Sequence, residues 1–221
     1  MIVSDRHKYL FIEIPRTGTT SMSYVLRKQA DGVRVKGEKH IRDIPQEAKD
    51  YKVFACVRNP YDRMYSHYCY RRARCLNRGK KLETKLRTFA DYVDYHVSGE
   101  EDHQNSNTQL WYLRYAANPL IVKFEDLPKS FLNLPFLPKN IKLPYTNSAS
   151  KGKWQDQYTE ELAEMVFSWA HQDFEQFEYN KESWRDQTVE RQRVQRRQDR
   201  RFQRRKIRRD QNASAFSDTA E

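Results

Sequence analysis

The stretch that most constrains the fold is residues 8–24, KYLFIEIPRTGTTSMSY. Residues 9–14 are mainly the aliphatic and aromatic types that favour a buried strand, and Pro15 ends that strand because it lacks an N–H donor. Gly18 then permits a sharp turn, and a helix is predicted over residues 20–29. A helix N-terminus with hydroxyls and a cation beside it is suited to hold a phosphate group. The stretch therefore predicts a strand, an anion-binding loop and a helix.

A second polar segment directly follows the next buried strand. Residues 52–57, KVFACV, are apolar almost throughout, as is typical of a parallel strand covered on both faces. Asn59 and Pro60 are a good N-cap and a good first helical residue, so a helix is predicted over residues 60–76. Arg58 and Ser66 lie two turns apart and only about 80° around the helix axis, so both can face one ligand.

Both segments resemble the donor-binding motifs of sulfotransferases that use 3′-phosphoadenosine 5′-phosphosulfate (PAPS). The loop PRTGTTS differs at one position from PKTGTTS, and VRNPYDRMYSHY is similar to the 3′-phosphate motif R-x-P-x-x-R-x-x-S. The resemblance implies that Arg58 and Ser66 bind the 3′-phosphate. It also implies that the loop surrounds the 5′-phosphosulfate with Arg16, Thr17, Gly18, Thr19, Thr20 and Ser21.

Features further along the chain resemble the carbohydrate-type branch of this family. These are Q-x-W-x-L at residues 109–113, a strand at 120–124 that runs into F-E-D-L, and D-F-x-x-F-x-Y at 173–179. Helices are expected over residues 45–51, 125–132 and 159–177. The resemblance implies an α/β, P-loop-like three-layer fold over residues 1–184, with a central, mostly parallel sheet flanked by helices.

Two further site residues are expected from the same resemblance. Family members carry a late basic segment that closes over the nucleotide, and Lys151 matches it, although an ordinary surface loop fits this sequence equally well. Related carbohydrate enzymes place a histidine on the acceptor side between the first helix and the next strand, where His40 lies. A neutral histidine, with a usual pKa of about 6.5, can take the acceptor's proton. His40 is therefore the expected base, with a surface-loop histidine as the alternative, and Arg16 is the expected catalytic cation.

The sequence leaves three classes of function open. The first is sulfuryl transfer from PAPS to a hydroxyl of a carbohydrate or small molecule, for which no metal is expected. The second is a nucleotide or polynucleotide kinase of related fold, which is disfavoured because the chain lacks GxxxxGK[ST] and a carboxylate metal site. The third is a non-enzymatic nucleic-acid-binding protein, which the charge favours but which does not explain the two phosphate motifs.

Charge and cysteine content bear on the partners and the compartment. The net charge is +11, and most of it lies in the Arg-rich segment 185–210. That segment has too few apolar residues to bury a helix face, so a disordered or loosely helical tail is expected over residues 185–221, with anionic polymers or a membrane surface as candidate partners. The chain has three cysteines, which are most simply read as reduced thiols, and its sequence shows neither a signal-like N-terminus nor an apolar run long enough to span a bilayer. We therefore expect a cytoplasmic protein.

A chain truncated after residue 185 should keep most of its stability, because the removed segment offers few apolar contacts. We expect its melting temperature to stay within a few degrees of the full-length value, measured by circular dichroism or calorimetry. A large decrease would show that the tail packs on the domain or on a second subunit.

Overall fold

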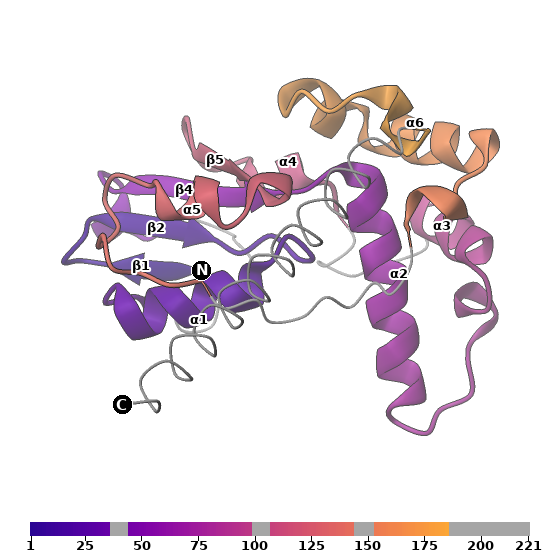
Figure 1. Ribbon diagram of the computed structural model, residues 1–221, viewed down its shortest axis with the longest axis horizontal. Helices are drawn as coiled ribbons and strands as arrows, with labels where there is room; N and C mark the ends of the chain where they lie inside the picture. Colours follow the sequence, from indigo (N-terminus) through magenta and orange to yellow (C-terminus); the bar gives the residue numbers. More distant parts are fainter. Residues whose placement is uncertain (36–43, 99–106, 144–152, 186–221) are drawn as a thin grey trace, which may run out of the picture. The chain divides into compact units, whose positions relative to one another are not determined.

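The computed structural model describes residues 1–35, 44–98, 107–143 and 153–185. Within these ranges the strands form one five-stranded sheet of order β3-β1-β2-β4-β5. The strands are β1 Ile2–Ser4, β2 Tyr9–Ile12, β3 Val33–Arg34, β4 Lys52–Val57 and β5 Leu120–Lys123. β4 pairs in parallel with β2 and β5, whereas β1 is antiparallel to β2 and β3 (Figure 1). The predicted α/β fold, with a sheet that is parallel at its centre and flanked by helices, is confirmed.

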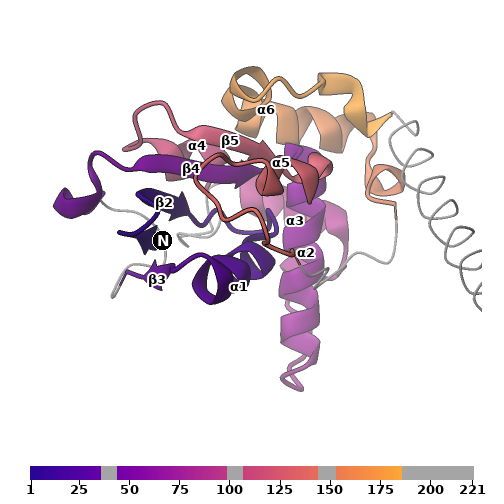
Figure 2. The same ribbon diagram turned by 60° about the vertical axis from the view of Figure 1, so that its left-hand side comes forward.

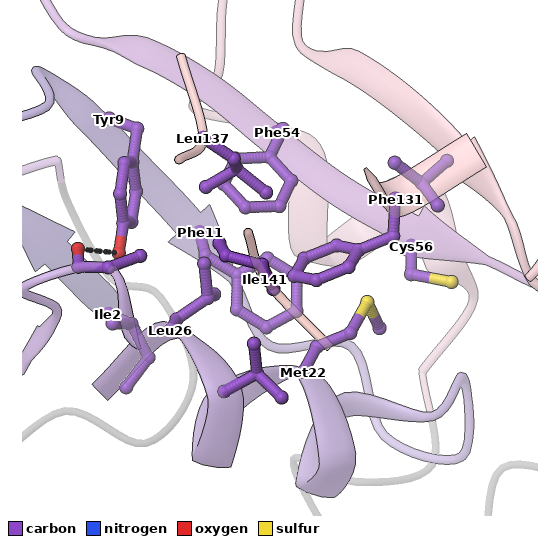
Figure 3. Packing of buried hydrophobic residues seen from close by; sticks show 13 residues of the cluster. Ile2, Tyr9, Phe11, Met22, Leu26, Phe54, Cys56, Phe131, Leu137 and Ile141 are labelled. Atoms are coloured by element: carbon purple, nitrogen blue, oxygen red, sulfur yellow. Dashed lines mark hydrogen bonds between the residues drawn. The ribbon is translucent and has the colours of Figure 1, made fainter. Parts of the chain in front are cut away.

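The central strands β2 and β4 are buried on both faces: their alternate residues point to opposite sides of the sheet, and almost all of these residues are buried. On one face Phe11 and Phe54 pack against α1, Thr19–Gln29, and against Phe131 of α5, Lys129–Leu132 (Figure 3). On the other face Leu10, Ile12 and Val57 pack with α4, Gln109–Leu113, through Tyr112 and Leu113. This double burial explains why residues 52–57 read as a continuous apolar run.

A second group of helices follows the carboxyl end of β4 (Figure 2). It contains α2, Pro60–Leu76, α3, Phe89–Val97, and α6, Glu160–Gln176, and the three helices contact one another. Asn59 caps α2 through a bond from the Tyr61 N–H to its side chain (3.0 Å), as the sequence predicts. Buried Tyr61 packs against Tyr158 and Phe174, so aromatic contacts fix α2 on α6. The start of α2 is therefore held firmly at the edge where β4 ends.

Three local predictions were wrong. The first strand is β1 rather than residues 9–14, and β2 already ends at Ile12. Residues 45–51 contain only the 3-10 turn η1, Gln46–Ala48, because β4 begins too soon after it for a helix. The helix expected over 125–132 is split into η3, Phe124–Asp126, and α5, because Pro128 interrupts the backbone hydrogen bonding. The remaining 3-10 turns are η2 Thr84–Leu86, η4 Gln155–Gln157 and η5 Lys181–Trp184.

The chain divides into two compact units, Met1–Lys181 and Glu182–Glu221, and the sheet and helices above belong to the first. The predictions for His40, Lys151 and the tail beyond residue 185 lie outside the described residues. In the part of the chain that is described, no helix combines the length and the apolar character needed to cross a bilayer.

Candidate active site

The two phosphate motifs meet at one edge of the sheet. β2 and β4 run in parallel with Ile12 opposite Ala55, so the segments that leave their carboxyl ends, after Ile12 and after Val57, start from the same edge of the sheet. The loop 15–18 continues from one strand and Arg58 from the other. Ligands of open α/β sheets bind at this carboxyl edge, where loops leave the strands.

Gly18 shapes the loop at the N-terminus of α1. Its φ is 81°, and a Cβ added there would lie 3.2 Å from the ring of Phe124. A side chain at this position would therefore combine backbone strain with a crowded contact. No side chain caps α1 at Gly18, so this end of the helix offers backbone N–H groups and a partial positive charge to an anion.

Arg16 is the loop's own cation, and its side chain lies against α2. Its Nε and Nη2 donate to Ser66 Oγ at 3.2 and 2.9 Å, and its guanidinium lies 4.7 Å from the centre of the Tyr70 ring. Burial lowers the pKa of the Arg16 guanidinium, and the nearby positive charge of Arg58 lowers it further. Within the described ranges no carboxylate pairs with it. Arg16 also has a φ of 71°, a strained backbone for a residue with a side chain. Among the described residues, the loop thus holds a cation that no carboxylate neutralises.

The Arg58 side chain hydrogen-bonds to the loop, whereas Ser66 hydrogen-bonds to Arg16. Its Nη1 donates to the carbonyl of Arg16 at 3.1 Å, and its Nη2 donates to Asp62 Oδ1 at 2.6 Å. The guanidinium stacks 4.3 Å from the centre of the Phe124 ring, and the side chain is only 9% exposed. Its Nε is buried and has no hydrogen-bond partner among the described residues. A buried, charged donor without an acceptor is costly, so this atom points to a missing ligand.

Arg63 also holds the loop, a role that the sequence analysis missed. Its Nε donates to the carbonyl of Pro15 at 3.1 Å, and its Nη2 donates to the carbonyl of Asn107 at 2.8 Å. Arg58, just before the N-cap of α2, and Arg63, in its first turn, therefore bind two successive loop carbonyls. The only sequence signal was that both arginines belong to R-x-P-x-x-R-x-x-S.

The hydroxyl residues of the loop divide into two sets. Thr17 is fully buried, and its hydroxyl donates to the carbonyl of Ile14 at 2.9 Å, so it stabilises the turn. Only the backbone of Thr17 remains to meet a ligand. Thr19 and Ser21 are half-buried and Thr20 is exposed, so these three lie where a bound group could reach them.

Three of the described histidines and Glu13 already have hydrogen-bond partners. His7 pairs with Asp31 at the opposite end of β2, and buried His67 and His96 both contact the hydroxyl of Tyr92. Glu13 accepts from Ser23 and Arg34. Burial raises its pKa, but these bonds and nearby positive charges outweigh burial, and the net pKa is below its usual value.

Glu125 also has structural partners. It accepts from the backbone N–H of Asn59 at 2.8 Å and from the hydroxyl of Tyr179 at 3.0 Å. Burial raises the pKa of Glu125. In the described ranges no group of three or more His, Cys, Asp or Glu side chains is arranged to hold a metal ion.

A comparison with protein families agrees with this geometry. Residues 1–180 match the sulfotransferase family, which covers most of the chain and includes both phosphate motifs. The chain belongs to the sulfotransferase family. Separate searches of curated proteins and of solved structures gave no significant match to this sulfotransferase. Family membership makes it a transferase of sulfuryl groups, with its motifs on the loop after β2 and on the first turns of α2.

Proposed function

We propose that this sulfotransferase uses PAPS as the sulfuryl donor and transfers the group to a hydroxyl of a carbohydrate or a small molecule. The observation that carries the proposal is the pair of guanidinium groups at the carboxyl edge of the sheet. Arg16 has no carboxylate partner in the described ranges, and Arg58 presents a buried Nε without an acceptor. A doubly phosphorylated nucleotide supplies the anionic acceptors that both groups lack.

The two phosphates are assigned to different parts of the site. The 5′-phosphosulfate is proposed to lie against the N-terminus of α1, within reach of the Arg16 side chain. The 3′-phosphate is proposed to bind Arg58 and Ser66. Ser66 Oγ already accepts from Arg16, which leaves its own O–H free to donate to a phosphate oxygen. The hydroxyl of Ser66 would thereby couple the two ends of the donor. Lys151, outside the described residues, remains the proposed closing contact.

In the proposed reaction, the acceptor oxygen attacks sulfur and an S–O bond forms. The S–O bond to the bridging phosphate oxygen breaks, and adenosine 3′,5′-bisphosphate leaves. His40 takes the acceptor's proton, and Arg16 with the α1 amides stabilises the charge that develops on the leaving phosphate. Arginine stays protonated at neutral pH, so Arg16 acts as an electrostatic group rather than as a proton donor.

A basic stretch of the chain bears on the kind of acceptor. The stretch 71–87 carries eight Lys or Arg residues and one Glu, and most of it is exposed. It begins next to Tyr70, against which Arg16 lies. Carbohydrates that carry carboxylate or sulfate groups therefore belong in an acceptor screen beside neutral sugars and small molecules. Transfer of radiolabelled sulfate from PAPS to members of this panel would identify the acceptor class, and no transfer to any of them would count against the proposed activity.

A cytoplasmic location and an anionic partner for the Arg-rich tail are also proposed. All three cysteines are unpaired, which suits the reducing cytoplasm. The Arg-rich tail is proposed to contact an anionic polymer or a membrane surface, because its charge is concentrated in one segment.

Arg58→Ala should weaken the binding of adenosine 3′,5′-bisphosphate by about 1–3 kcal/mol, as expected for the loss of a charged hydrogen bond. Isothermal titration calorimetry measures this change, with a thermal melt to show that the variant is folded. Arg27→Ala is the control, because this exposed arginine lies in the last turn of α1, away from the loop. Unchanged affinity in folded Arg58→Ala would remove Arg58 from the site.

A further inference from the structure

The side-chain amide of Gln109 hydrogen-bonds to both the N–H and the carbonyl of Arg58. The N–H of Arg58 donates to Gln109 Oε1 at 2.8 Å, and Gln109 Nε2 donates to the carbonyl of Arg58 at 2.9 Å. Arg58 lies just past the end of β4, and none of the described strands pairs with it. The amide of Gln109 takes the place of that missing strand and is itself fully buried.

Asp173 in turn fixes Gln109. Its two carboxylate oxygens accept from the backbone N–H groups of Gln109 at 2.7 Å and Leu110 at 2.9 Å. Asp173 is fully buried on α6, and these bonds attach the first turn of α4 to that helix. The backbone of Gln109, and with it the base of its side chain, therefore cannot shift without breaking buried hydrogen bonds to the Asp173 carboxylate.

The same chain of contacts reaches the phosphate loop. The Arg58 guanidinium donates to the loop carbonyl of Arg16 and is aligned by Asp62 on its other side. Asp173, Gln109, Arg58 and the loop thus form one continuous hydrogen-bonded series from α6 to the proposed donor site. A shift of the Arg58 backbone would move both its guanidinium and the loop carbonyl that it holds.

We propose that Gln109 is a positioning residue for the donor nucleotide and that it acts through Arg58. This inference rests on the proposed function, because it requires that Arg58 binds the nucleotide. Gln109 is fully buried and its side-chain amide binds the backbone of Arg58, so we propose that it orders the site through Arg58 and does not touch the reacting atoms. Space filling in the core does not require hydrogen bonds to both the N–H and the carbonyl of Arg58, which the Gln109 amide makes.

A double-mutant cycle tests the proposal. The variants are Gln109→Met, which keeps the length and loses both hydrogen bonds, Arg58→Ala, and the two together. Gln109→Met should bind adenosine 3′,5′-bisphosphate about fivefold to tenfold more weakly, because part of the free energy lost with the two hydrogen bonds has to be spent to place Arg58 for the nucleotide. In the Arg58→Ala background the same substitution should cause no further loss, because the route through Arg58 is gone. In turnover assays the KM for PAPS should rise while kcat holds.

Tyr9→Phe is the matched control for a purely structural loss. It removes a buried bond of 2.8 Å from the Tyr9 hydroxyl to the carbonyl of Ala30, at the opposite end of β2 (Figure 3). It should lower the melting temperature while leaving nucleotide affinity unchanged. Gln109→Glu gives a second test, since only the protonated acid can both accept from and donate to Arg58. Relative to the wild type at each pH, it should bind the nucleotide more tightly at pH 5.5 than at pH 8.

The outcomes distinguish a failure of the proposed PAPS-dependent function from a failure of the proposed role of Gln109. If the wild type does not bind adenosine 3′,5′-bisphosphate, the proposed function and this inference both fail. If the wild type binds but Gln109→Met weakens binding equally in both backgrounds, or not at all, only the role of Gln109 is overturned. Should Gln109→Met not fold, Gln109→Glu takes its place in the cycle at pH 8, where its ionised carboxylate cannot donate to the Arg58 carbonyl, with the same criterion.

Discussion

Arg16→Ala is expected to lower the rate of sulfuryl transfer by about 100-fold to 1,000-fold, the range found when one preorganised donor to a developing charge is removed. Arg16 is the cation of the loop, and no carboxylate in the described ranges neutralises it. Its charge is therefore available to the phosphate that leaves as the S–O bond breaks. Turnover at saturating PAPS measures this loss, and calorimetry with adenosine 3′,5′-bisphosphate gives the accompanying loss of affinity.

Arg16→Lys separates charge from geometry. Lysine keeps the positive charge but cannot make the paired contact with Ser66 Oγ that Nε and Nη2 make at 3.2 and 2.9 Å. We expect this variant to retain more activity than Arg16→Ala. Arg6→Ala is the matched control, since this exposed arginine pairs with Asp31 at the far end of β2. If folded Arg16→Ala turns over at the wild-type rate, Arg16 has no part in catalysis.

His40→Ala should reduce turnover about a hundredfold or more while the affinity for adenosine 3′,5′-bisphosphate holds. The physical reason is that the acceptor hydroxyl must lose its proton as its oxygen attacks sulfur. A histidine base is active only when neutral, so wild-type turnover should fall as the pH drops through about 6.5, the usual pKa of histidine. The variant should lose this acid limb of the pH profile.

His7→Ala and His171→Ala are the controls for His40, and neither should change turnover. His7 pairs with Asp31 away from the loop, and His171 is exposed on α6. Wild-type turnover in His40→Ala would refute the assignment. The carboxylates of Glu13 and Glu125 would then be tested next, although each already accepts hydrogen bonds from structural partners.

The sequence predicted those parts of the fold that local signals determine. The apolar run of β4 and the Asn59-Pro60 start of α2 gave bounds that agree with the structure, Lys52–Val57 and Pro60–Leu76. Gly18, with its positive φ, marked the turn before α1. These signals are strong because each depends on backbone chemistry within a few residues.

The parts that the sequence did not predict depend on tertiary contacts. β1 is short, and its strand character comes from pairing with β2 on one side and β3 on the other. Gln109 and Asp173 lie 64 positions apart, so their shared role in holding Arg58 has no local signature. The Arg16–Ser66 contact likewise depends on how the loop and α2 meet, which the spacing of the Arg58 motif alone does not give.

The most direct test of the PAPS site is a calorimetric titration with adenosine 3′,5′-bisphosphate in the presence of EDTA, compared with adenosine 5′-monophosphate. We expect saturable one-to-one binding of the bisphosphate without metal, and weaker binding of the monophosphate, because the monophosphate lacks the 3′-phosphate that engages Arg58 and Ser66. No binding of the bisphosphate, equal affinity for the two nucleotides, or binding that requires added Mg²⁺ would contradict it.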